Sequence, residues 1–147
     1  FATHFAPAMA EEALSIYRKH FKVSKYLDEP YFILGVLAHG ADTDEEAERL
    51  YTIAQQGSIR LLREEKGLYP LADEKFDENL NLSSAEKIFL KSRMGINLMG
   101  SKETMTKIWK EVKAKFDPDE VIAVSYMPKL EELEKSYRIL KEVVENN

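Results

Sequence analysis

The feature that most constrains this chain is an unbroken apolar segment at residues 31–38, YFILGVLA, which directly follows Pro30. A strand with one face in water alternates apolar and polar residues, and this segment shows no alternation. Continuous apolar runs of this length are typical of strands that are buried on both faces, as in parallel sheets. We therefore expect residues 31–38 to form an interior strand of an α/β protein.

Amphipathic helices are predicted on both sides of this strand. Apolar residues recur with helical spacing from residue 9 to about residue 21, and Pro7 suits a first helical turn. Residues 43–46, TDEE, form a capping box in which the Thr43 hydroxyl accepts from the N–H of Glu46 and the Glu46 carboxylate reaches back. The apolar stripe that follows predicts a helix to about residue 63.

The second half of the chain contains a polar segment and then three more helices. Residues 66–82 have turn-forming residues and only isolated apolar ones, which predicts a mobile loop. Helices are expected at residues 83–93, 101–116 and 130–144. A strand is expected at residues 121–127, between the last two of these helices. We interpret the chain as a single partial α/β-barrel domain with units at residues 1–27, 28–65, 66–99 and 100–147.

The alternation of strands and helices, with a first strand at residues 1–5, predicts a parallel sheet. Right-handed crossovers between neighbouring strands place all helices on one face of such a sheet, which leaves the other face uncovered. Three solutions remain open from this reasoning. The chain is a fragment of a barrel, a doubly wound small domain, or one member of an oligomer that shares its sheet.

Composition excludes several classes of protein. The 147 residues carry 21 Lys and Arg against 26 Asp and Glu, a net charge of −5, which argues against nucleic-acid binding. The absence of Cys excludes disulfides, zinc ribbons and iron–sulfur clusters, and it fits a cytoplasmic protein. No apolar run approaches the roughly 20 residues that span a bilayer, so no membrane association is expected.

Two histidines lie where catalytic residues are often found. His4 and His39 each follow a predicted strand, and the C-terminal ends of parallel strands carry the functional residues of barrels and open sheets. The alternative is two hydrogen-bonded histidines at a rim. No metal site is predicted, because two histidines without a carboxylate motif are a weak ligand set.

The segment at residues 95–102, GINLMGSK, looks like a phosphate-binding loop. The order of its residues is wrong, because that motif requires Gly-Lys-Ser/Thr after a strand. We interpret it as a turn followed by a helix that is capped by Ser101.

The order of these motifs resembles the C-terminal part of the luciferase-like flavin-dependent monooxygenases, the bacterial luciferase superfamily. The matching pieces are residues 1–18 (FATHFAP into EEALSIYR), 30–50 (PY into ADTDEEAERL) and 100–125 (GSKET into DEVIAVS). The resemblance implies the last three strand–helix units of a (β/α)8 barrel, with the predicted strands as the sixth, seventh and eighth. It also implies chemistry with reduced FMN and O₂ on a small organic substrate.

The resemblance implies a set of site residues at these strand ends. Thr3, His4 and Phe5 are expected to lie against the isoalloxazine ring, with His4 as the catalytic residue. The resemblance also implies, with a weaker match, that Leu37, His39 and Ser125 bind the cofactor. The five earlier strands, which in the family help to hold the FMN phosphate, lie outside this chain. The expected partner is therefore the N-terminal half of the barrel or a second copy, and the chain alone is expected to be inactive. A non-catalytic flavin-binding relative and a deazaflavin-dependent oxidoreductase are the alternatives.

Overall fold

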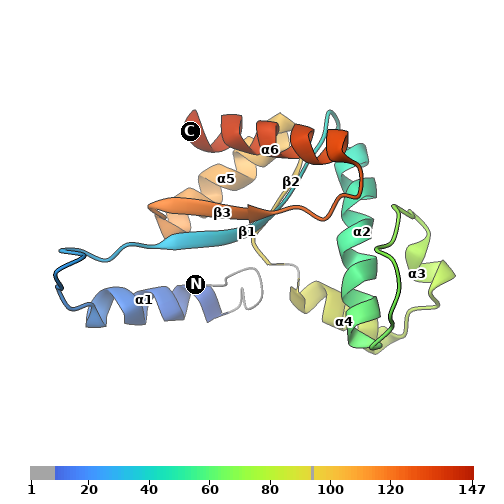
Figure 1. Cartoon of the computed structure of the whole chain (residues 1–147), viewed down its shortest axis with the longest axis horizontal. Coiled ribbons are helices and arrows are strands. Elements are labelled where there is room, and N and C mark those ends of the chain that lie inside the picture. The colour runs from blue at the N-terminus through green and yellow to red at the C-terminus, as the bar shows by residue number, and fades with distance from the viewer. Residues whose placement is uncertain (1–8, 94) are drawn as a thin grey trace.

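The computed structural model describes residues 9–93 and 95–147. The elements follow in the order α1 (Ala10–His20), β1 (Ile33–Gly40), α2 (Asp44–Leu62), α3 (Phe76–Asn79), α4 (Ser84–Arg93), β2 (Asn97–Gly100), α5 (Lys102–Phe116), β3 (Glu120–Val124) and α6 (Leu130–Glu145) (Figure 1). The five longer helices and two of the strands correspond to predicted elements. The strand predicted at residues 1–5 lies outside the described residues.

Within the described residues the sheet has three parallel strands in the order β2-β1-β3. The N-terminal half of β1 pairs with β3, from Ile33 opposite Glu120 to Leu37 opposite Val124. Its C-terminal half pairs with β2, from Leu37 opposite Asn97 to Gly40 opposite Gly100. Only Ile33 of the residues in β1 is exposed. The prediction of a buried, parallel strand in this region is confirmed, although the strand begins and ends two residues later than expected.

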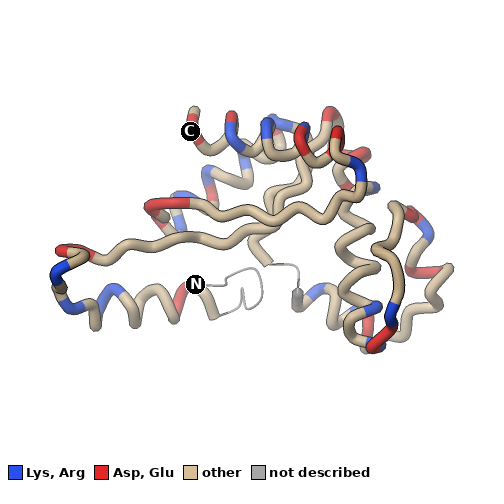
Figure 2. The backbone as a smooth tube through the Cα atoms, in the orientation of Figure 1, with Lys and Arg blue, Asp and Glu red and all other residues tan. Residues whose placement is uncertain are grey.

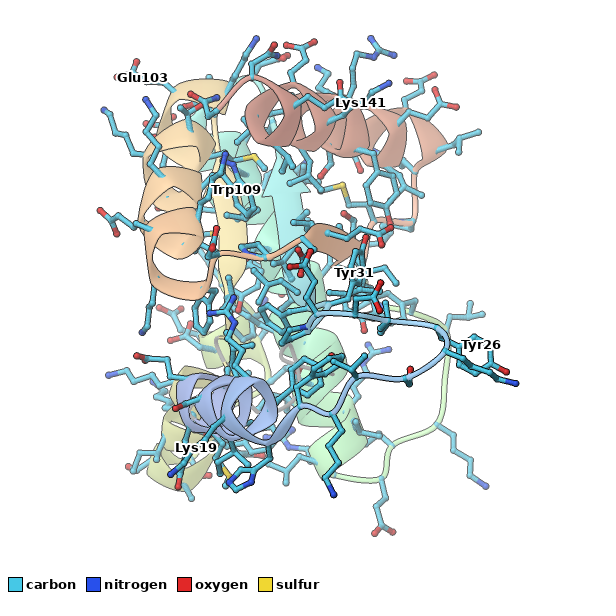
Figure 3. All side chains as sticks on the ribbon, turned by 90° about the vertical axis from the view of Figure 1, so that its left-hand side faces the viewer. Lys19, Tyr26, Tyr31, Glu103, Trp109 and Lys141 are labelled. Carbon is cyan, nitrogen blue, oxygen red and sulfur yellow. The ribbon has the colours of Figure 1, made fainter. Side chains whose placement is uncertain are left out.

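One face of the sheet carries the main core. Every second side chain along β1, together with Phe32 just before it, packs against α5 and α6. The residues are Phe32, Leu34, Val36 and Ala38 on this side, and Met105, Trp109, Leu140 and Val143 on the helices. Figure 3 shows Trp109 directed from α5 toward the strands, whereas Glu103 and Lys141 point outward. Each large apolar side chain buried here contributes about 1.5–3 kcal/mol to folding. Helix α1 joins the same core through Ala10 and Leu14.

Within the described residues, the other face of the sheet is covered only at its C-terminal end. Helix α2 runs crosswise past that end of β1 (Figure 1), and its Tyr51 and Ala54 pack on Leu37. The expectation that all helices lie on one face is therefore wrong, because the short connection after Gly40 turns α2 across the strand end. The remainder of this face leaves Ile33 at 36% and Ile122 at 58% of their full exposure.

Two details of local structure differ from the predictions. Residues Asn97–Gly100, interpreted as a turn, form the short strand β2, while Ser101 caps α5 as expected by accepting from the N–H of Thr104. At α2, Thr43 accepts from the N–H of Glu46, but the Glu46 carboxylate binds Arg49 with two 2.7 Å contacts and does not reach back. A two-point, charge-assisted pair with Arg49 outcompetes a single bond to a backbone N–H.

The capping box at the start of α4 forms completely. The N–H of Ser83 donates to the Glu86 carboxylate at 2.8 Å, and the N–H of Glu86 donates to the Ser83 hydroxyl. The Arg63 guanidinium is the largest influence that lowers the pKa of Glu86, to about 2. This pair ties the end of α2 to the start of α4.

Charged side chains are distributed over the helix surfaces without segregation by sign. Figure 2 shows Lys and Arg interspersed with Asp and Glu along α6. No helix among the described residues is both long enough and apolar enough to cross a membrane.

Candidate functional site

A cavity of about 290 Å³ lies beside the C-terminal ends of β1 and β3, on the sheet face that α2 covers. Five parts of the chain surround it: β1, α2, α4, and the segments around residues 69 and 126. The lining residues are Leu37, Tyr51, Ala54, Gln55, Gly57, Ser58, Leu61, Tyr69, Leu90 and Tyr126. None of these side chains carries a charge at neutral pH, so the cavity is suited to a neutral ligand.

The segment at residues 66–82 contributes one wall of this cavity because α2 holds it in place. Outside α3 the segment is irregular, as predicted. Gln56 donates to the carbonyl of Leu71 at 2.7 Å, and Arg60 donates to the carbonyl of Leu68 at 2.6 Å. These two bonds flank Tyr69 and bring its ring against the cavity.

Three tyrosines give the cavity its aromatic character. The rings of Tyr69 and Tyr126 stack with their centroids 5.7 Å apart and their planes at 15°. Burial, assisted by the neighbouring Tyr126, raises the pKa of Tyr69 to about 12. Burial also raises the pKa of Tyr51. Both phenols are therefore neutral at physiological pH.

His39 lies behind one wall of the cavity. Its imidazole is fully buried and contacts the ring of Tyr51 edge to face, with centroids 5.1 Å apart. Burial lowers the pKa of His39 to about 4, and the side chain of Asn97 opposes part of this change. Neither ring nitrogen has a hydrogen bond of good geometry, and the same is true of the Asn97 side-chain oxygen. His39 is thus a neutral imidazole with unused hydrogen-bonding capacity.

Ser125 follows β3 and points away from the cavity, toward β1 and α6. Its hydroxyl donates to the carbonyl of Ala38 at 2.5 Å and lies 3.5 Å from the hydroxyl of Ser136. Ser136 in turn accepts the N–H of Gly40 at 2.9 Å. These contacts join the end of β1 to β3 and α6, so the Ser125 hydroxyl has a structural role.

The structure brings the predicted site residues together only in part. Leu37 lines the cavity, His39 is separated from it by Tyr51, and Ser125 is engaged with the backbone of β1. Thr3, His4 and Phe5 lie outside the described residues, so their roles stay predictions.

Sequence reasoning missed the residues that define most of the cavity: Tyr51, Gly57, Tyr69 and Tyr126. Tyr51 lies in the apolar stripe predicted for the helix that ends near residue 63, and Tyr69 lies in the polar segment at residues 66–82. The one available signal was Gly57, because a glycine inside a helix often has a packing reason.

Curated relatives match the chain in sequence. A protein of Escherichia coli (strain K12) named luciferase-like monooxygenase is 32% identical over 122 residues, which are 83% of this chain and 36% of that protein. The predicted resemblance to the luciferase-like monooxygenases is confirmed by this match. A second relative, the uncharacterized protein YddN of Bacillus subtilis (strain 168), is 34% identical over 99% of this chain and 42% of its own length. No protein-family model matches.

The chain spans about two fifths of the length of the curated relatives that it matches. Its fold is also found in a solved structure, that of apo-MsnO8. The two share 24% sequence identity and superpose with a TM-score of 0.79 over 96% of this chain and 42% of the other.

Proposed function

We propose that this chain is part of an FMN-dependent monooxygenase that uses reduced flavin and O₂ on a small organic substrate. The observation that carries the proposal is the neutral, aromatic cavity at the C-terminal ends of parallel strands, in a chain that resembles the luciferase-like monooxygenases. These strand ends are where α/β proteins bind ligands and cofactors. The cavity volume is at the lower end of the range for ligand sites, about 300–1,000 Å³.

The residues present fit the flavin ring and not its phosphate. In this proposal the isoalloxazine ring lies against the sheet-side edge of the cavity, formed by Leu37 and Tyr126, and leaves the cavity itself for the substrate. The proposal adds Thr3, His4 and Phe5 from the family resemblance. A phosphate needs Lys, Arg or several free N–H groups, and no basic side chain lines the cavity. The chain alone is therefore proposed to hold FMN weakly.

When bound, reduced flavin supplies the electrons for the reaction with O₂. The contribution of this chain is to exclude water and to orient the ligand. Leu37, Ala54, Leu61 and Leu90 keep the cavity dry, and the neutral tyrosines avoid placing a charge beside the reacting groups. His39 is neutral above about pH 4, so it places no charge behind the Tyr51 ring that it contacts.

We also propose that β1 and β3 are the seventh and eighth strands of an eight-stranded barrel. The two strands are parallel neighbours although α2, α3, α4, β2 and α5 lie between them in sequence, as in consecutive barrel strands with an insertion. Ile33 and Ile122 are exposed on the face that would turn to the barrel interior. The remaining strands, or a second copy of the chain, would cover them.

The proposal is tested by comparing FMN with lumiflavin, which has the same ring and no phosphate. Fluorescence titration of the 147-residue chain should give dissociation constants above about 1 μM for both, within about twofold of each other, because the chain contacts only the ring. If FMN binds tenfold more tightly than lumiflavin, the chain contains a phosphate-binding site, which contradicts the proposal. If neither flavin binds, the proposed site for the flavin ring is wrong.

Activity is tested by oxygen uptake with reduced FMN and a long-chain aldehyde. The isolated chain should not change the uptake measured with reduced FMN and aldehyde alone. Aldehyde-dependent turnover by the isolated chain would contradict the proposal that another part of the barrel is required.

A further inference from the structure

Gly57 lies inside α2, where glycine is the least favourable residue apart from proline. A Cβ atom at this position would lie 2.9 Å from the hydroxyl oxygen of Tyr69 and 3.2 Å from its Cζ. Real Cβ atoms essentially never approach another atom within 3.0 Å. The absence of a side chain at residue 57 therefore lets the phenol of Tyr69 lie directly against the helix.

Tyr69 has little freedom to move away from Gly57. Its backbone is held on both sides by Arg60 and Gln56, through the carbonyls of Leu68 and Leu71. Its ring is stacked on Tyr126. Both Gly57 and Tyr69 line the cavity, so a side chain at residue 57 would take up space in it directly and would also displace one of its walls.

The chemistry of the lining restricts what the cavity can hold. A ligand with a carboxylate or an ammonium group would be transferred from water to a site that has no opposite charge, which is strongly unfavourable. Aromatic rings gain additional contact energy against other rings in stacked or edge-to-face arrangements, and three tyrosines line this cavity. Its volume of about 290 Å³ suits a small molecule.

We propose that this cavity binds a neutral aromatic molecule of about the size of indole, and that Gly57, acting through Tyr69, determines how large that molecule can be. The inference rests on the proposed function, since the bound molecule would be the organic substrate. Gly57 is a specificity-determining residue in this proposal and takes no part in the reaction itself.

The test is a titration of the isotope-labelled 147-residue chain, followed by ¹H–¹⁵N NMR without flavin. Indole is the neutral probe, and indole-3-carboxylate is the charged probe with the same ring. Indole should shift the amides of residues around the cavity, such as Ala54, Leu61 and Leu90. The carboxylate should bind at least tenfold more weakly.

The matched pair of variants is Gly57→Ala and Gly67→Ala. A Cβ at Gly67 would meet only the Arg60 guanidinium, at an ordinary 3.9 Å. Gly57→Ala should weaken indole binding at least fivefold, whereas Gly67→Ala should leave it within twofold. Adding Tyr69→Phe to Gly57→Ala removes the oxygen that the new Cβ meets at 2.9 Å, and it should restore most of the affinity.

Amide dispersion and the melting midpoint of each variant establish that it is folded. If Gly57→Ala does not fold, the variant that combines Gly57→Ala with Tyr69→Phe still tests the proposal. Indole shifts that are absent, or that lie away from the cavity, would overturn the site. Equal binding of the two probes would overturn its neutrality, and equal effects of the two glycine variants would overturn the role of Gly57. Indole binding in a chain that binds no flavin would leave this site standing while the proposed function fails.

Discussion

The carboxylate of Asp44, the first residue of α2, accepts the backbone N–H of Ser101 at 2.6 Å and the hydroxyl of Thr104 at 2.8 Å. It therefore occupies the position at the start of α5 where a helix would bind an anion. Gly100 has a φ of +132°, and a Cβ there would lie 2.8 Å from the same carboxylate. The segment that looks like a phosphate loop thus has its anion supplied by the chain itself.

Replacement of Asp44 by Ala should lower stability in a pH-dependent way. The N–H of Ser101 is the largest influence that lowers the pKa of Asp44. A carboxylate with a lowered pKa stabilises the folded state above its unfolded pKa of about 3.9, and this contribution is lost as the pH falls through the folded value. Urea unfolding of the wild type and of Asp44→Ala should therefore differ at pH 7 and converge at acidic pH.

The control for that experiment is Glu45→Ala, which removes a carboxylate from the same first turn of α2. In Glu45→Ala, the free energy of unfolding should change between neutral and acidic pH nearly as much as it does in the wild type. If both variants behave alike, the effect belongs to the helix dipole and not to the contact between α2 and α5.

Thr43→Ala should destabilise the protein by about 0.5–2 kcal/mol, because the Thr43 hydroxyl caps α2 by accepting the N–H of Glu46. Thr43→Ser keeps the hydroxyl and should retain most of the stability. Thermal melting of the three proteins checks the prediction. An unchanged midpoint for Thr43→Ala would mean that the cap contributes nothing to folding.

The buried His39 should make the protein less stable as the solution is acidified. Its folded pKa of about 4 lies below the unfolded value of about 6.5, so the unfolded chain binds a proton first as the pH falls. Stability should decrease between pH 6.5 and pH 4, by about 3 kcal/mol in total. NMR titration of the imidazole should show no protonation of His39 at pH 5.5.

The His39→Leu variant should lack this acid-dependent loss, whereas the exposed His20→Gln should keep it. Protonation of His39 near pH 6.5 in the folded protein would contradict the burial that the structure shows.

The uncovered part of the sheet should cause the isolated chain to associate. Ile33 on β1 and Ile122 on the neighbouring strand β3 are exposed on the same face of the sheet, and burial of each would contribute about 1.5–3 kcal/mol. Light scattering at low micromolar concentration should therefore report species larger than a monomer. Ile122→Thr should reduce association, while Leu130→Thr, on α6, should not. A wild-type monomer with a sharp melting transition would contradict this.

Local patterns predicted most of the helices and strands because their causes are local. The stripe and cap of α2, the Ser83–Glu86 box before α4, and the apolar run of β1 are each encoded within a few residues. Strand β2 was missed because it has four residues, and its pairing partner lies about sixty positions earlier in the chain.

The candidate site was less predictable because it depends on tertiary placement. His39 was correctly located at the end of a strand, but its burial depends on Tyr51 of α2, whose crosswise course no sequence pattern indicates. Tyr69 reaches the cavity only because Arg60 and Gln56 hold a polar segment against their helix. Such contacts between distant side chains leave little trace in a single sequence.

The central position of β1 also determines the order in which the chain can fold. Both strands that pair with it in the described sheet, β2 and β3, are synthesised after it, so β1 leaves the ribosome before either of them exists. Distant pairing requires the closure of long loops, which slows folding and prolongs the time during which such a segment can aggregate. During translation, the strand at the centre of the described sheet is therefore the first of these three to be made and the last to have both of its edges paired.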